Sequence, residues 1–84
     1  MAAKILVVDD QENMCWILSK VLAEAGFAVE TARSGKEALA CVAAGGITAA
    51  IVDYRLPDMN GIQLLHRMKN VTSHIAAILI TSYG

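Results

Sequence analysis

Three aspartates come directly after apolar segments that read as β-strands, and they are the residues of this sequence best suited to chemistry. Asp9 and Asp10 follow residues 4–8, and Asp53 follows residues 47–52. Carboxylates that meet at one edge of a sheet repel one another, so either one of them retains a proton or a hard cation binds among them. An all-oxygen set of this kind suits Mg²⁺, and no histidine or cysteine is placed to make a zinc site.

A simpler role exists for each aspartate taken alone, because a residue after a strand often caps the next helix, as Asp10 would for the first helix. Three such residues at one sheet edge, with the Thr81 hydroxyl following residues 75–80, favour a cation site over separate caps. The fourth aspartate, Asp58, lies in the loop after Asp53. These residue types indicate an acidic Mg²⁺ site and do not identify the reacting group.

The elements that must position these residues alternate between strands and helices. Short apolar or alternating runs predict strands over residues 4–8, 27–31, 47–52 and 75–80. Apolar residues at helical spacing predict three helices between them. The inward-facing residues expected of these helices are Met14, Ile17, Leu18, Val21, Leu22 and Ala25 in the first, Ala38, Leu39 and Val42 in the second, and Ile62, Leu65 and Met68 in the third.

Helix boundaries are marked by capping residues. Ser34, with Glu37 three positions later, predicts a capping box at the second helix, and Asn60 predicts a cap at the third. Gly26 stands where the first helix should end in a left-handed residue. The order β-α-β-α-β-α-β predicts an α/β fold with a doubly wound parallel sheet, whose ligands bind beyond the carboxyl ends of the strands. We treat residues 1–84 as one domain.

The composition excludes several classes of protein. Hydrophobic residues make up 56% of the chain and charged residues 18%, which predicts a folded domain. The net charge of −1 gives no electrostatic basis for direct binding to nucleic acid. No run reaches the length of a membrane span. Cys15 and Cys41 fall within helical patterns, and we expect reduced, structural thiols in a cytoplasmic protein.

Four segments resemble the receiver domain of two-component response regulators. They are ILVVDDQ (residues 5–11), TARSGKEAL (31–39), IVDYRLPDMNG (51–61) and ILITSYG (78–84). The D-x-x-L-P-x-M-x-G block with an upstream V-V-D-D is a specific signal, and the resemblance covers the whole chain. It implies a flavodoxin-like strand order of 2-1-3-4, with a fifth strand beyond.

The resemblance also implies a role for each site residue. Asp53 would be the nucleophile that accepts a phosphoryl group from the phosphohistidine of a sensor histidine kinase. Asp10 would bind Mg²⁺ directly, Asp9 mostly through water, and Arg55 through its backbone carbonyl. Thr81 would be the hydroxyl that moves toward the phosphoryl group; Ser82 offers a second hydroxyl, although the register favours Thr81.

The family continues with a helix, a fifth strand that ends in a phosphate-contacting lysine, and a last helix, which these 84 residues do not include. Its members often carry a carboxyl-terminal output domain, and the motif style suits a DNA-binding domain that regulates transcription. Standing alone, the fragment would have a bare fourth strand, which favours a homodimer.

With the resemblance taken into account, three functional classes stay open. The first is a phosphoacceptor signalling domain that is not a turnover enzyme. The second is an aspartyl-phosphate-forming phosphotransferase, which would usually carry an acid two residues after the nucleophile, where this chain has Arg55. The third is a receiver-like interaction module that is not phosphorylated. Trp16 lies off the apolar stripe of its helix and marks either a kinase-docking surface or partial packing, and His66 and His74 are expected to be solvated.

Overall fold

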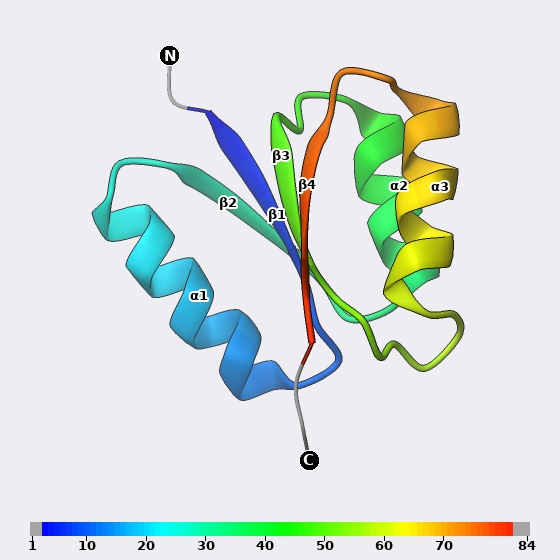
Figure 1. The fold of residues 1–84 in the computed structure, drawn as a ribbon. Coiled ribbons are helices and arrows are strands. Elements are labelled where there is room, and N and C mark those ends of the chain that lie inside the picture. Colours follow the sequence, from blue (N-terminus) through cyan, green and yellow to red (C-terminus); the bar gives the residue numbers. More distant parts are fainter. Residues whose placement is uncertain (1–2, 82–84) are drawn as a thin grey trace.

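The computed structural model describes residues 3–81, in which strands and helices alternate in the predicted order (Figure 1). The strands are β1 (Lys4–Val8), β2 (Ala28–Ala32), β3 (Ala49–Asp53) and β4 (Ala76–Ile80), and the helices are α1 (Glu12–Glu24), α2 (Gly35–Ala44) and α3 (Gly61–Val71). The predicted strand at residues 47–52 is shifted along the chain, so that Asp53 belongs to the strand itself. In the described part of the chain, no helix is long and apolar enough to cross a membrane.

The four strands form one parallel sheet in the order β2-β1-β3-β4, which confirms the predicted doubly wound, flavodoxin-like arrangement. Helix α1 covers one face of the sheet, and α2 and α3 lie side by side on the other (Figure 1). The chain leaves β1 toward β2 on one side and later returns to place β3 on the other. The switch in strand order therefore falls between β1 and β3, where ligands bind in such sheets.

The main core lies between the sheet and helices α2 and α3. The buried residues of this core are Leu6, Val8, Ala32, Ala38, Val42, Ala50, Val52, Leu64, Met68 and Ile75. The prediction for α3 was wrong in one position, because Ile62 is 46% exposed and Leu64 is fully buried. The buried Gly61, Leu64 and Met68, with the half-buried Leu65, follow the spacing i, i+3, i+4, i+7 of a single helix face.

The apolar stripe predicted for α1 is only partly buried. Leu18 and Leu22 are half-buried, whereas Met14, Ile17 and Val21 are 39%, 49% and 56% exposed. Within residues 3–81 this helix packs against β1 and β2. The apolar side chains that point away from these strands are not covered by another element of the described chain. The most buried residue of α1 is instead Cys15, at 5% exposure, in agreement with a structural thiol.

Side-chain caps begin two of the helices. The Ser34 hydroxyl accepts a hydrogen bond from the Glu37 backbone N–H at 3.1 Å, but no return bond to the Glu37 side chain forms in the described chain, so the predicted capping box is half made. The complete box is at α3, where Asn60 and Gln63 exchange both bonds. Gly26 has a φ of 97°, a conformation that favours glycine after a helix.

Candidate functional site at the carboxyl edge of the sheet

Asp53 is the last residue of β3 and the one buried charged side chain among residues 3–81, with 8% of its surface exposed. It follows the fully buried Val52 at the carboxyl end of the strand, so its carboxylate lies at the rim of the core. Its Oδ1 accepts a long hydrogen bond, 3.4 Å, from the backbone N–H of Arg55. Burying a carboxylate is costly unless it is paired, which marks Asp53 as a candidate functional residue.

Asp9 and Asp10 come to Asp53 from the neighbouring strand. Val8 pairs with Val52 in the β1–β3 register, so the residues after each strand meet at the same edge. One carboxylate oxygen from each of the three aspartates lies within 4.8 Å of the others. Asp9 is half-buried and Asp10 is exposed. The predicted convergence of these three residues is therefore present.

The alternative role of Asp10 as a helix cap does not apply. The N-cap of α1 is Gln11, and this helix receives no side-chain capping bond. The Asp9 carboxylate accepts a hydrogen bond from the Gln11 N–H at 2.9 Å instead. The Asp10 carboxylate does not cap this helix and is therefore available to the acidic cluster.

The electrostatics of the cluster oppose three free charges. Burial raises the pKa of Asp9, and the nearby charges of Asp53 and Asp10 raise it further, while the bond from Gln11 lowers it. A hard divalent cation relieves this repulsion, and carboxylate oxygens are the ligands that Mg²⁺ prefers. The donor set therefore fits Mg²⁺ on the chemistry of its side chains.

Residues 54–60 form a loop that is fixed at both ends. The Tyr54 N–H donates to the Ile80 carbonyl at 2.8 Å, and the Gly61 N–H donates to the Tyr54 carbonyl at 2.7 Å. Arg55 is exposed and pairs with Asn60 in an isolated antiparallel bridge. Its backbone is thus held beside Asp53, where the family resemblance implies a metal-binding carbonyl.

Asp58 has a structural function that the sequence did not disclose. Its carboxylate accepts bonds from the backbone N–H groups of Gly35 and Lys36, at 2.8 and 2.9 Å, and so caps α2 from the loop after β3. These bonds hold the pKa of Asp58 below its ordinary value. Only the fold brings this loop to the start of α2, and no local signal could have identified the pair.

Thr81 follows β4 and is exposed. The register pairs Asp53 with Ile80, so Thr81 stands one residue beyond the level of Asp53 on the neighbouring strand. Ser82, the other candidate hydroxyl, lies outside the described residues. His66 and His74 are exposed, and Trp16 is 64% exposed with the Lys20 ammonium 5.1 Å from its ring centre.

Fold and site together define the class of protein. It is a doubly wound α/β domain with three aspartates at the switch point of its parallel sheet. The model of the response regulator receiver domain matches residues 5–84, and the chain belongs to this family. It is a receiver domain of two-component response regulators, a family of signalling modules.

The similar proteins are response regulators. The chain is 36% identical over its whole length to sporulation initiation phosphotransferase F of Bacillus subtilis, of which it covers 68%. Other relatives are named as regulatory proteins, among them the transcriptional regulatory protein TcrA of Mycobacterium tuberculosis and the DNA-binding transcriptional regulator NtrC of Salmonella typhimurium, and the chain spans between 17% and 36% of their length.

Solved structures show the same fold. A CheY-like receiver domain protein from Methanospirillum hungatei superposes with a TM-score of 0.95 at 30% identity, covering 100% of this chain and 67% of that one. The response regulator TrrA of Thermotoga maritima, solved in complex with Mg²⁺ and beryllium fluoride, gives a TM-score of 0.90 at 32% identity, covering 98% of this chain and 71% of that one.

Proposed function

We propose that Asp53 is the phosphoacceptor of this receiver domain and that it takes its phosphoryl group from a sensor histidine kinase. The observation that carries the proposal is the burial of Asp53, at 8% exposure, beside the carboxylates of Asp9 and Asp10. A carboxylate held at the rim of a core, with one edge open to an acidic cluster, is suited to nucleophilic attack once its charge is balanced.

Asp9, Asp10 and Asp53, with the backbone carbonyl of Arg55, would hold Mg²⁺. When bound, the cation neutralises charge on the phosphoryl oxygens during transfer. The crowding of the carboxylates, which raises the pKa of Asp9, supports this assignment. Asp10 is the exposed member of the trio and is expected to bind directly, with Asp9 acting mostly through water.

The reaction is an in-line phosphoryl transfer. A carboxylate oxygen of Asp53 attacks the phosphorus of a phosphohistidine, the P–N bond breaks, and the imidazole nitrogen keeps the electron pair. An acyl phosphate forms on Asp53, and the Thr81 hydroxyl moves to donate a hydrogen bond to a phosphoryl oxygen. The domain supplies position and charge balance and is not a turnover enzyme.

We infer further partners from the family. Relatives named as transcriptional regulators are several times longer than this chain, which supports a carboxyl-terminal output domain that binds DNA, while this domain itself does not. The family's function in signalling supports a cytoplasmic location. Within residues 3–81, Ile78 and Ile80 on β4 are 63% and 39% exposed, so a fragment of these 84 residues by itself is expected to form a homodimer; a monomeric mass of that fragment in light scattering at high concentration would contradict this.

The deciding experiment is phosphorylation in the presence of Mg²⁺. We would incubate the full-length protein with Mg²⁺ and a small acyl-phosphate donor, measure the intact mass, and map the acid-labile adduct. The adduct is expected on Asp53, and Asp53→Asn should abolish it. Arg55→Ala should keep Mg²⁺ binding, because the predicted ligand is a backbone carbonyl. An adduct on another residue, or none, would contradict the proposal.

A further inference from the structure

The backbone carbonyls of Asp9 and Asp10 each accept a side-chain hydrogen bond from a different part of the fold. The Cys15 thiol of α1 donates to the Asp9 carbonyl at an S···O distance of 3.2 Å. The Arg33 guanidinium, just after β2, donates to the Asp10 carbonyl at 3.1 Å. Two consecutive acidic residues are therefore held from two sides by groups that touch their backbone and leave their carboxylates free.

Few other bonds fix this turn. Helix α1 begins without a side-chain cap, in contrast to α2 and α3, whose N-caps both accept such a bond. Within the described residues, the turn is otherwise held by the Asp9 N–H, which donates to the Ala32 carbonyl at 3.0 Å, and by the bond from Gln11 to the Asp9 carboxylate. That last bond is made to the Asp9 carboxylate, a group of the proposed cation site, and holds the side chain as well as the turn.

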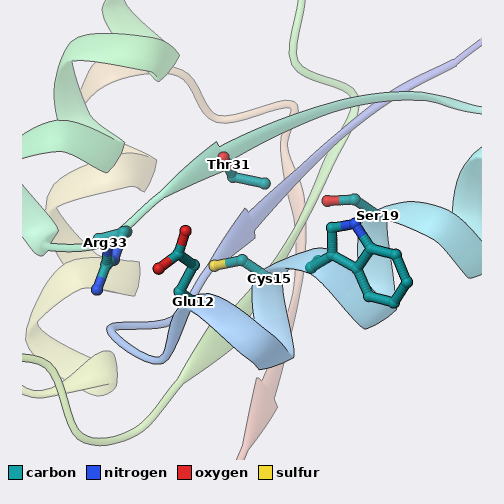
Figure 2. A pocket seen from close by; sticks show the side chains of 6 residues that line it. Glu12, Cys15, Ser19, Thr31 and Arg33 are labelled. Atoms are coloured by element: carbon teal, nitrogen blue, oxygen red, sulfur yellow. The ribbon is translucent and has the colours of Figure 1, made fainter.

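Cys15 and Arg33 also border one hollow of about 350 Å³ between α1 and β2 (Figure 2). Glu12, Trp16, Ser19 and Thr31 complete its lining. Figure 2 shows Cys15 and Glu12 rising from α1 and Arg33 standing across from them at the end of β2. The two donors thus line one hollow and both contact the backbone of the acidic turn.

We propose that Cys15 and Arg33 are positioning residues for the acidic pair: they hold the Asp9 and Asp10 backbone in the conformation that presents both carboxylates to Asp53 before a cation arrives. This inference rests on the proposed Mg²⁺ site. Preorganised ligands need less rearrangement on binding, and groups that orient ligands commonly affect metal affinity without touching the metal. Arg33 adds a positive charge, but its exposure means that solvent screens this charge, so geometry is its main contribution.

The test is the Mg²⁺ dissociation constant of the full chain, measured by isothermal titration calorimetry. Cys15→Ala removes the donor, whereas Cys15→Ser keeps one at the same place. Arg33→Ala removes the second donor, and Arg33→Lys keeps the positive charge but lacks the planar guanidinium group. We expect the double variant to weaken binding by about tenfold, the lower end of the range seen for groups that orient metal ligands, and each single alanine variant to weaken it by less. Cys15→Ser should stay close to the wild type.

Ser19→Ala is the matched control, because Ser19 lines the same hollow and its buried hydroxyl has no partner within the described residues. It should leave the dissociation constant unchanged. Equal Mg²⁺ affinity in the wild type and the double variant would overturn the positioning role, as would equal losses in Cys15→Ser and Cys15→Ala. Because Arg33 is exposed, its variants keep the test valid even where a Cys15 variant loses stability. A wild-type chain that binds no Mg²⁺ would overturn the proposed function and this inference with it.

Discussion

Asp58 and Gly35 join the loop after β3 to the start of α2 through a hydrogen bond of 2.8 Å from the Gly35 N–H to the Asp58 carboxylate. The second carboxylate oxygen accepts from Lys36 at 2.9 Å. Both donors are amides of a helix N-terminus, which stabilise a negative charge. The loop that carries Arg55 is thus tied to α2, on the face of the sheet that α2 and α3 cover.

We predict that Asp58→Asn lowers the thermal midpoint near neutral pH, and that the difference from the wild type disappears in acid. The pKa of Asp58 in the fold lies below its ordinary value of 3.8, so its contribution is present above that value and is lost as the pH falls through the folded pKa. Thermal melts across this pH range would measure the effect. Glu37→Gln at the same helix start is the control, and a gap that persists in acid would contradict the explanation.

We predict that Asp9→Asn stabilises the cation-free protein while weakening Mg²⁺ binding. Like charges about 4 Å apart repel by about 1 kcal/mol even in water, and this is the expected order of the gain in free energy of unfolding. The pKa of Asp9 is raised, so the wild type loses stability as the pH rises from 3.8 through the folded pKa, and the variant does not. Denaturant titrations at low and high salt would test this, with Glu24→Gln as control; no gain at low salt would contradict it.

Gly61 and Gly35 should differ in their tolerance of alanine. A Cβ at Gly61 would lie 2.8 Å from the Asp53 backbone oxygen and 2.5 Å from Leu79 Cδ1, whereas the three atoms nearest to a Cβ at Gly35 all belong to the flexible Met59 side chain, the first at 2.5 Å. Gly61→Ala should therefore cost about 1–3 kcal/mol, the usual range for overpacking, and should also weaken Mg²⁺ binding by displacing Asp53.

Double variants separate a clash with a flexible side chain, expected at Gly35, from a clash with the backbone, expected at Gly61. Met59→Ala should restore most of the stability lost in Gly35→Ala, because it removes the three atoms that lie nearest to the added Cβ. Leu79→Ala should not restore Gly61→Ala, because the contact with the Asp53 backbone remains. Full rescue at Gly61 would show that the backbone approach is not the cause.

The corrected face of α3 gives a further prediction. Leu64→Ala should cost about 2–5 kcal/mol in free energy of unfolding, as expected for a buried leucine that leaves a cavity. Ile62→Ala, at a residue with 46% exposure, should change it by no more than about 0.5 kcal/mol. Chemical denaturation of both variants would measure the two values. A larger loss at Ile62 than at Leu64 would mean that the helix faces the sheet as the sequence alone had suggested.

Much of this fold could be read from local patterns. Runs such as residues 4–8 are apolar on both faces, and that periodicity identifies a covered strand before any packing is known. The alternation of strands and helices leads to a parallel sheet because right-handed crossovers leave few other arrangements. Carboxyl ends of parallel strands share one edge, so Asp9, Asp10 and Asp53 had to meet wherever β1 and β3 are neighbours.

Tertiary structure decided what depends on contacts between distant segments. The sequence shows that α1 and α3 are amphipathic, but only their place in the layers exposes Ile17 and Ile62 while burying Cys15 and Leu64. A helix face is buried when another layer covers it, and hydrophobicity alone does not supply that layer.

At the site, too, the sequence determines some properties and the tertiary structure determines others. The types and order of its aspartates are fixed by the sequence, and so is the chemistry that a carboxylate cluster can perform. The bonds from Arg33 to Asp10 and from Gly35 to Asp58 each span 23 residues, and no local pattern encodes a hydrogen bond between segments that only folding brings together. Sequence determined which groups are present at the carboxyl edge of the sheet, and tertiary structure determined how firmly each one is held there.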